Sequence, residues 1–194
     1  MPDATAHVAS KLYLLVLLTL VSTAETSAQQ IVLEPNALCA GNPGTAIPTF
    51  EDANLEDAIR ASIGVQRDHV LTCALFSRSG GRSIRADSYG ISRIMGIQNV
   101  GFRRILSLQF NKISDLTPLN GLPAIRTLWL TGNRIRDISV LGNLIDLQTL
   151  EAASNQIEDI KALRELKHLG RLVLGDNRIS DISPLGDLGN ELWE

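Results

Sequence analysis

The sequence predicts an α/β-type repeat solenoid. This is a right-handed coil with a parallel sheet on one side, short 3-10 or irregular segments on the other, and a helical cap before the first coil. Three observations predict it. A phrase built around an asparagine occurs four times at intervals of 22 residues, and leucine and isoleucine recur at fixed places within each copy. A stretch with apolar residues at helical spacing precedes the copies.

Each copy has the same layout of apolar and polar positions. One copy reads "IRTLWLTGNRIRDISVLGNLID" over residues 125–146, and alignment on the asparagines gives L-x-x-L-x-L-x-x-N-x-I-x-D-I-x-x-L-x-x-L. This is the pattern of a leucine-rich repeat. Four such repeats occupy residues 103–190. Because one repeat cannot bury its apolar side alone, we expect the copies to stack into a right-handed horseshoe.

The first residues of each repeat are expected to form a strand of a parallel, concave sheet. Alternate residues of a strand point to the same side, so Leu128 and Leu130 should face the core. Thr127, Trp129 and Thr131 should then face outward. The outward positions of successive strands are therefore the candidate binding surface.

Two polar ladders follow the strands. An amide side chain at the turn after each strand can hydrogen-bond backbone groups that have no strand partner. A carboxylate four residues later can accept from N–H groups where a short helical turn begins. Both ladders are predicted to be structural, since the four aspartates form one row with no second row to hold a metal. Their members are Asn111, Asn133, Asn155 and Asn177, and Asp115, Asp137, Asp159 and Asp181.

Residues 81–102 read as a degenerate first repeat. They keep apolar residues at the core positions, but Tyr89 stands in place of the asparagine and Arg93 in place of the aspartate. Terminal repeats of a solenoid are expected to be atypical. The regular repeats are therefore predicted to be preceded by one that has lost its polar ladder.

An N-terminal segment with a helical cap is predicted over residues 29–80. In "FEDANLEDAIRASIG" the apolar residues fall at helical spacing, Asp52 or Asn54 can cap the start, and Gly64 can end the helix. A second short helix is expected in "DHVLTCALFS". These helices would cover the apolar end of the first repeat.

The chain has two cysteines, Cys39 and Cys73, and both precede the regular repeats. In an oxidising compartment they would pair and pin the leading segment to the cap. The alternative is two buried free thiols. Of the two, we predict a disulfide between them.

The two ends of the chain differ from its middle. Residues 1–28 read as a signal peptide, with an apolar run of about ten residues before small residues and cleavage after Ala28 or, alternatively, Ala24. A membrane anchor would need about 20 apolar residues. The sequence thus predicts a secreted, periplasmic or cell-envelope protein without a span in its mature chain. The tail at 191–194 either covers the last repeat with Trp193 or ends a shortened product.

Composition and motifs argue against several function classes. The net charge of −3 disfavours nucleic acid as a partner, because phosphate binding needs a basic face. None of the three histidines has a Ser, Cys or carboxylate at motif spacing, and no nucleophile, zinc or phosphate-loop motif is present. We therefore expect no enzyme, no cofactor and no metal.

The phrases "NKISDLTPL", "NRIRDIS", "NQIEDIKAL" and "NRISDISPL", with the cap before them, resemble bacterial secreted leucine-rich-repeat proteins of the internalin type. The resemblance covers roughly residues 47–188. It implies binding of a protein partner through the concave sheet, by a chain expected to be a monomer. Fold alone does not determine function. A carbohydrate- or ligand-sensing extracellular domain and a truncated remnant of a larger surface protein stay open as alternatives.

Trp129 is the prominent residue of the predicted binding face, because aromatics make up only 4% of the chain. An outward-facing tryptophan in the middle of a concave sheet fits a binding hot spot. The alternative is that the ring covers neighbouring threonines without any partner. The predicted partner-binding residues are Arg85, Ser107, Gln109, Thr127, Trp129, Thr131, Glu151, Arg171 and Val173.

Overall fold

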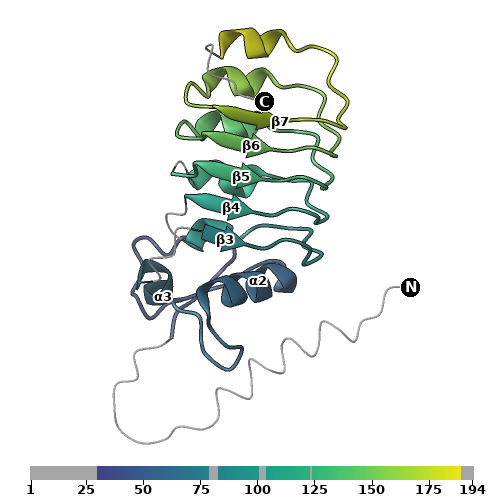
Figure 1. The fold of residues 1–194 in the computed structure, drawn as a ribbon. Helices are drawn as coiled ribbons and strands as arrows, with labels where there is room; N and C mark the ends of the chain where they lie inside the picture. The colour runs from purple at the N-terminus through teal and green to yellow at the C-terminus, as the bar shows by residue number, and fades with distance from the viewer. Residues whose placement is uncertain (1–29, 79–82, 101–103, 123, 189–194) are drawn as a thin grey trace, which may run out of the picture.

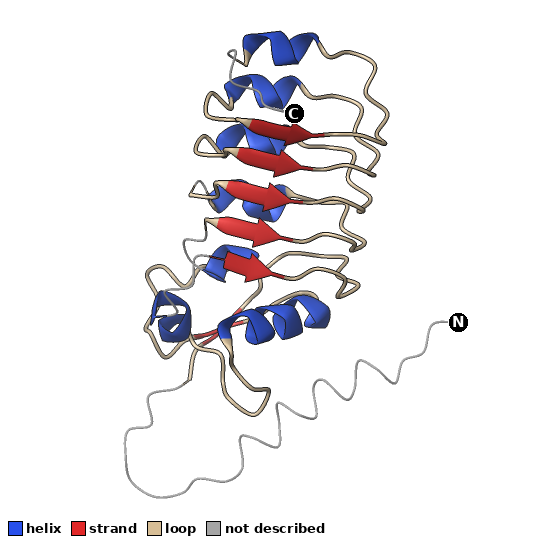
Figure 2. Ribbon diagram, in the orientation of Figure 1, coloured by secondary structure: helices blue, strands red, loops and turns tan. Residues whose placement is uncertain are grey.

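The computed structural model describes residues 30–78, 83–100, 104–122 and 124–188. The predicted leader at 1–28 and the tail at 191–194 lie outside these residues. The main feature is a stack of five parallel strands in the order β3-β4-β5-β6-β7, each added beside the preceding one (Figures 1 and 2). The strands are β3 Ser83–Arg85, β4 Ile105–Ser107, β5 Thr127–Trp129, β6 Thr149–Glu151 and β7 Arg171–Val173.

The strands pair in the register that the 22-residue period predicts. Leu106 lies opposite Leu128, and Leu128 lies opposite Leu150. The row continues to Ile84 at one end and Leu172 at the other. One aliphatic side chain from every repeat therefore stacks on its counterpart, and the predicted leucine-rich-repeat solenoid is confirmed.

Backbone hydrogen bonds between repeats continue beyond the short strands. The N–H of Leu130 donates to the carbonyl of Glu151 at 2.6 Å, and that of Gly132 donates to Ala153 at 3.0 Å. The same two bonds recur between the other adjacent repeats. Each repeat is thus tied to the next over more residues than the three assigned to a strand.

Short 3-10 helices lie on the side of the stack opposite the sheet (Figure 2). Pro118 and Pro184 occupy the first turn of two of them, where a missing N–H costs nothing. These helices return the chain to the start of the next strand. They are η1 Ile97–Val100, η2 Thr117–Gly121, η3 Ser139–Asn143, η4 Lys161–Glu165 and η5 Ser183–Asp187.

A cap covers the β3 end of the stack. Helix α2 (Ala53–Ile63) lies against β3, begins after the N-cap Asp52, and ends at Gly64, whose φ of 71° is left-handed. Leu55, Ala58 and Ile59 form its buried side. The predicted helix and both its boundaries are confirmed. The cap also contains the two-stranded parallel sheet of β1 (Val32–Leu33) and β2 (Ile47–Pro48) and helix α3 (Cys73–Arg78).

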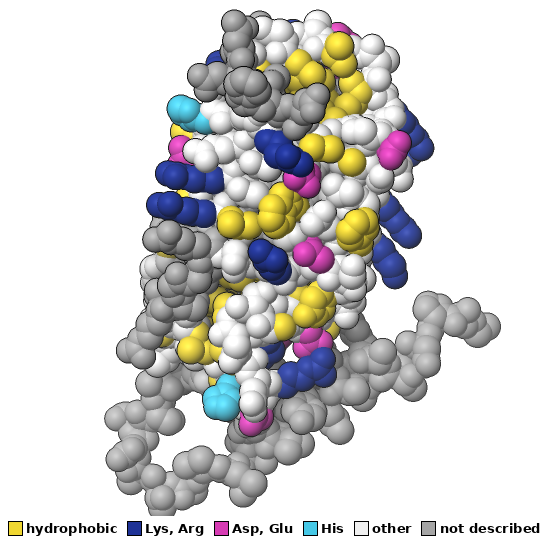
Figure 3. Space-filling model, in the orientation of Figure 1, with side chains coloured by type: hydrophobic (Ala, Val, Ile, Leu, Met, Phe, Trp, Pro, Cys, Tyr) yellow, Lys and Arg dark blue, Asp and Glu magenta, His cyan; other side chains and the backbone are white. Residues whose placement is uncertain are grey.

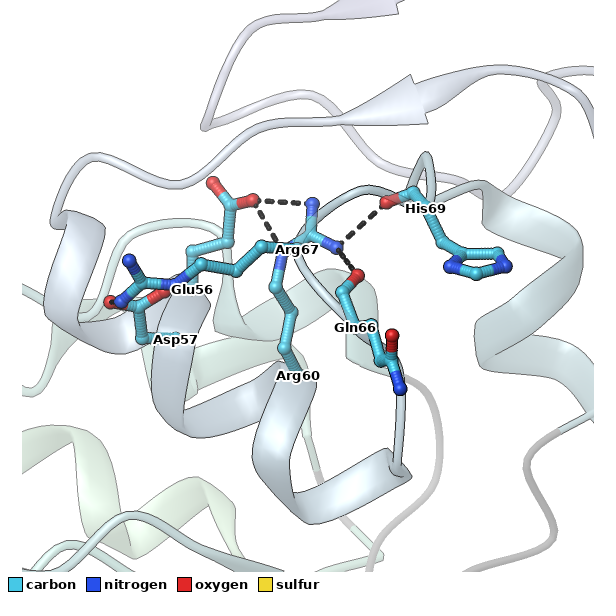
Figure 4. A network of polar contacts seen from close by, with 6 residues as sticks. All are labelled: Glu56, Asp57, Arg60, Gln66, Arg67 and His69. Carbon is cyan, nitrogen blue, oxygen red and sulfur yellow. Dashed lines mark hydrogen bonds and ion pairs between the residues drawn. The ribbon is translucent and has the colours of Figure 1, made fainter.

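A network of polar contacts fastens the loop after α2 to the helix (Figure 4). The Arg60 guanidinium pairs with Glu56 at 2.8 Å. It also donates to the backbone carbonyls of Gln66 at 3.0 Å and His69 at 2.8 Å. Because one side chain joins the helix to two points of the loop, Arg60 sets the path of the chain toward α3.

A disulfide joins Cys39 to Cys73, with 34 residues of sequence separation. Asn99 strengthens the same attachment from η1, since its amide accepts from the Cys39 N–H at 2.7 Å and donates to the Ala37 carbonyl at 2.8 Å. The leading segment is thereby held to α3 and to the first repeat. Of the two alternatives for the cysteines, the structure has the bridge.

The hydrophobic core runs without interruption from the cap through the repeats. In the last described repeat Leu172, Leu174 and Ile179 are half-buried, whereas Leu150 and Ile157 one repeat earlier are fully buried. The described residues therefore cover the core less well at this end than at the cap.

Candidate protein-binding face

The outward positions of the strands form one continuous row across the sheet. Arg85, Ser107, Trp129, Glu151 and Val173 are successive register partners. Figure 3 shows this face, on which hydrophobic side chains are interspersed with charged side chains of both signs. The row spans the described sheet from end to end and places Trp129 at its middle.

Ser107 differs from the expectation that it faces solvent. The residue is 0% exposed, and its hydroxyl donates to the Asp87 carboxylate. Asp87 also accepts from the N–H of Gln109 at 2.9 Å. The outward strand position is correct, but these neighbours cover Ser107, which cannot contact a partner.

Trp129 is half-buried rather than fully exposed. Its indole Nε1 is shielded from solvent and has no hydrogen-bond partner among the described residues. A buried donor without an acceptor costs about 1–3 kcal/mol. Trp129 thus occupies an outward strand position, and its indole N–H makes no hydrogen bond to the described residues.

The remaining predicted contact residues lie on the same face but differ in exposure. Glu151 pairs with Arg171 at 3.0 Å, so two of the predicted contacts already bind each other. The Arg171 end of this pair is exposed to water, which weakens its contribution to stability. Arg85 and Arg171 are exposed, whereas Gln109, Thr127, Thr131, Glu151 and Val173 are half-buried.

The asparagine ladder joins each repeat to the one before it. Asn133 accepts from the N–H of Ile113 at 3.1 Å and donates to the carbonyls of Leu108 and Leu130, both at 2.9 Å. Two of these partners belong to the preceding repeat and one to its own. Equivalent bonds are made by Asn111, Asn155 and Asn177. The amides thus satisfy loop backbone groups that no strand reaches.

The aspartate ladder caps the 3-10 helices. The carboxylate of each member accepts from the N–H of the first helical residue at 2.8–2.9 Å. The N–H of Ser139 and of Lys161 lowers the pKa of Asp137 and Asp159, respectively, and the Ser183 hydroxyl lowers that of Asp181. The ladder members are Asp115, Asp137, Asp159 and Asp181.

Asp52 supplies the polar contacts that the degenerate first repeat lacks. Its carboxylate accepts from the N–H and hydroxyl of Ser92 at 2.8 and 3.0 Å, from the N–H of Arg93 at 3.2 Å, and from Asn54 at 2.9 Å. Burial raises the pKa of Asp52, but these donors together lower it below its usual value. Arg93, at the lost aspartate position, pairs with Glu51 of the cap.

A row of left-handed residues at the edge of the sheet was not predicted from the sequence. The residue before each ladder position has a positive φ in all five described repeats. Glycine and aspartate suit this conformation and serine is at least small, but Phe110 occupies it as well, with φ 55°. The recurrence of short residues at this place could have indicated a left-handed turn, but Phe110 breaks that pattern. The row is Ser88, Phe110, Gly132, Ser154 and Asp176.

A hollow of about 460 Å³ lies between the cap and the first two repeats, lined by polar and apolar side chains that include the paired Glu51 and Arg93. Within the described ranges no group of three or more His, Cys, Asp or Glu residues could hold a metal ion. Nor does this part of the chain contain a helix long and apolar enough to span a membrane.

Comparisons with known proteins agree with this geometry. Residues 104–143 and 145–187 match the family described as Leucine Rich repeats (2 copies). The chain is similar to the structure of an internalin (inlF) from Listeria monocytogenes, with 31% identity and a TM-score of 0.68, over 73% of this chain and 43% of that one. This chain therefore spans less than half the length of that internalin. No curated protein matches the sequence.

Two further structures from Listeria monocytogenes are similar. Internalin C2 (inlC2) is 30% identical over 74% of this chain and 84% of that one, with a TM-score of 0.41. The functional domain of InlJ is 16% identical over 71% and 35%, with a TM-score of 0.57. The repeat pattern, the capped solenoid, the match to the leucine-rich-repeat family and the likeness to the internalin inlF lead to one conclusion: the chain belongs to the internalin type of leucine-rich-repeat proteins.

Proposed function

We propose that the protein is an exported interaction module. It binds a protein partner through the sheet-bearing face, which is the outward side of the five-stranded sheet. The observation that carries this proposal is Trp129, which lies at the middle of the row of outward strand residues and whose indole Nε1 has no hydrogen-bond partner among the described residues. Tryptophan is enriched among residues that dominate binding energy, above all near the centre of an interface. An acceptor supplied by the partner would let a small rotation of the ring satisfy the N–H.

The size of the face limits the affinity that it can support. Five strands at a spacing of about 4.8 Å and a length of about 16 Å give roughly 400 Å² of sheet. A standard interface buries about 800 Å² on each partner. The sheet alone therefore fits weak binding, and a tight complex would need further contacts from loops, from the cap, or from an insertion of the partner.

We further propose that the protein is not an enzyme and acts without a cofactor as a monomer. The absence of catalytic motifs in the sequence supports a binding role, as does the engagement of both polar ladders in structural hydrogen bonds. A carbohydrate-binding role receives less support, since Trp129 is the one aromatic residue in the described outward strand rows.

Export is part of the proposal. The leader predicted at residues 1–28 and the disulfide between Cys39 and Cys73 both fit an oxidising compartment outside the cytoplasm. Expression of the full sequence in a bacterium should yield a processed chain whose N-terminus is Gln29. An N-terminus at Met1 in the exported fraction, or retention of all the protein in the cytoplasm, would contradict export.

The binding proposal is tested by capturing proteins from a bacterial culture and from host-cell surfaces with immobilised chain 29–194. Captured partners are then measured by calorimetry. Trp129→Ala should weaken binding at least tenfold, on the scale of a modest hot spot. Ile145→Ala is the control, because Ile145 is a 59% exposed apolar residue two positions after η3 and outside the strands. Equal affinity of the wild-type and Trp129→Ala proteins would reject Trp129 as the anchor.

A further inference from the structure

The edge of the sheet carries an aromatic side chain that folding does not explain. Phe110 is 61% exposed and has a φ of 55°. Left-handed backbone is unfavourable for a bulky residue, and an exposed phenyl ring gains little by burial. The equivalent residues Ser88 and Ser154 show that a small polar residue serves the same turn. Strain retained where a simpler residue would serve points to a functional role.

The backbone and a neighbouring glycine hold Phe110 in place. Its N–H donates to the carbonyl of Thr131 at 2.8 Å, which fixes the turn to the next repeat. Its ring lies over Gly132, where an added Cβ would come within 2.7 Å of the ring. The ring is therefore set against the following repeat while more than half of the side chain faces solvent.

Positively charged residues follow Phe110 and its counterpart Gly132 two positions later in the sequence. The position after each ladder asparagine is occupied by Lys112, Arg134, Gln156 and Arg178. Lys112 and Arg134 are exposed, and neither forms an ion pair with a described carboxylate. Arg178, by contrast, approaches Glu158 at 3.8 Å. Figure 3 shows Lys and Arg side chains in a column along one edge of the sheet-bearing face.

We propose that Phe110, Lys112 and Arg134 form a docking edge for an acidic segment of a protein partner. This inference rests on the proposed binding function and extends its contact surface beyond the sheet. An apolar side chain of the segment covers the Phe110 ring, and flanking carboxylates pair with the two cations. Desolvated pairs of this kind gain more than fully exposed ones, because the ring and the partner exclude water.

Charge along the edge determines where the segment lies. Asp115 and Asp137 follow three residues after the two cations, and their carboxylates already accept N–H groups of 3-10 helices. At the far end of the row, Asp176 takes the position that Phe110 has here. An acidic segment therefore finds an apolar ring and cations outside ion pairs at the second and third repeats, whereas the last repeat offers Asp176 and a cation that already approaches Glu158.

The chain itself supplies the variants that test the docking edge. Phe110→Ser copies the residue at the equivalent positions 88 and 154, and Lys112→Gln with Arg134→Gln copies Gln156. Arg178→Gln is the control, because it removes a cation from the same row far from Phe110. Each variant keeps a residue that the same turn already tolerates elsewhere in the chain.

The probe is a phage-displayed library of random twelve-residue peptides, selected on wild-type chain 29–194. Selected peptides are synthesised, and fluorescence anisotropy gives their affinity. We expect net-negative peptides that contain a large apolar residue. Phe110→Ser and the double glutamine variant should each weaken binding at least tenfold, and Arg178→Gln should change it less than twofold. Affinity should also fall as NaCl is raised from 50 to 500 mM.

Several outcomes would overturn the docking edge. Peptides without negative charge, or no enriched peptides at all, would do so. Weakening by Trp129→Ala but not by Phe110→Ser would reject the edge and leave the proposed function standing. Binding of heparin fragments that depends on Lys112 and Arg134 but not on Phe110 would indicate a site for polyanions instead. A clearly lower Tm of Phe110→Ser would show that the ring stabilises the fold. The proposal expects an unchanged or higher Tm for this variant.

Discussion

Replacement of Asn133 by alanine tests the claim that the asparagine ladder holds the repeats together. The side chain is 8% exposed and makes three hydrogen bonds, to the N–H of Ile113 and to the carbonyls of Leu108 and Leu130. A hydrogen bond contributes about 1 kcal/mol net, and a buried N–H left without a partner costs about 1–3 kcal/mol. Asn133→Ala should therefore lower the free energy of unfolding by about 3 kcal/mol.

The same substitution at Asn177 should cost less, although Asn177 makes equivalent hydrogen bonds. Asn177 is half-buried, so water can replace the lost amide. We expect a loss of about 1–2 kcal/mol there. Asn143→Ala is the surface control, because Asn143 is exposed and bonds only the side chain of Asn120 among the described residues.

Urea unfolding followed by circular dichroism gives the three free energies of unfolding, and fluorescence tests whether unfolding is a single transition. The thermal midpoint of Asn133→Ala should fall by about 6–12 °C, as expected for a domain of this size. A loss below 1 kcal/mol at Asn133, or equal losses at Asn133 and Asn177, would refute the burial argument.

Three further predictions concern the turn, the cap and the disulfide. Gly132→Ala should destabilise the protein by about 1–2 kcal/mol in urea unfolding, because φ is 73° and the new Cβ displaces the ring of Phe110. The lowered pKa of Asp52 contributes stability that is present above about pH 4 and is lost as pH falls through the folded-state pKa. Between pH 6 and pH 2 the Tm of the wild type should thus fall more steeply than that of Asp52→Asn, and parallel curves would contradict this. Removing the bridge by Cys39→Ala and Cys73→Ala should cost about 4 kcal/mol, from the entropy of a loop with 34 residues of separation. Dithiothreitol should lower the Tm of the wild type but not of this double variant.

The sequence by itself determined the periodic features of the fold. A 22-residue period places Leu106, Leu128 and Leu150 one above another, because a parallel sheet built from identical coils pairs equivalent residues. The helix boundaries at Asp52 and Gly64 were also predictable, since a carboxylate N-cap and a left-handed glycine are local requirements of the backbone. Such features depend on residues close in sequence or on a repeat that is visible in it.

Tertiary structure alone decided which outward residues are accessible and which polar groups are paired. Ser107 and Trp129 occupy equivalent strand positions, yet Ser107 is fully buried with its hydroxyl bonded to Asp87, whereas the indole N–H of Trp129 has no partner among the described residues. The strained turn at Phe110 likewise emerges only when the chain is folded. Exposure and pairing depend on side chains brought together from different repeats, and no single repeat contains that information. The strand pattern therefore predicted where the candidate face lies, whereas contacts between repeats determine which of its residues a partner can reach.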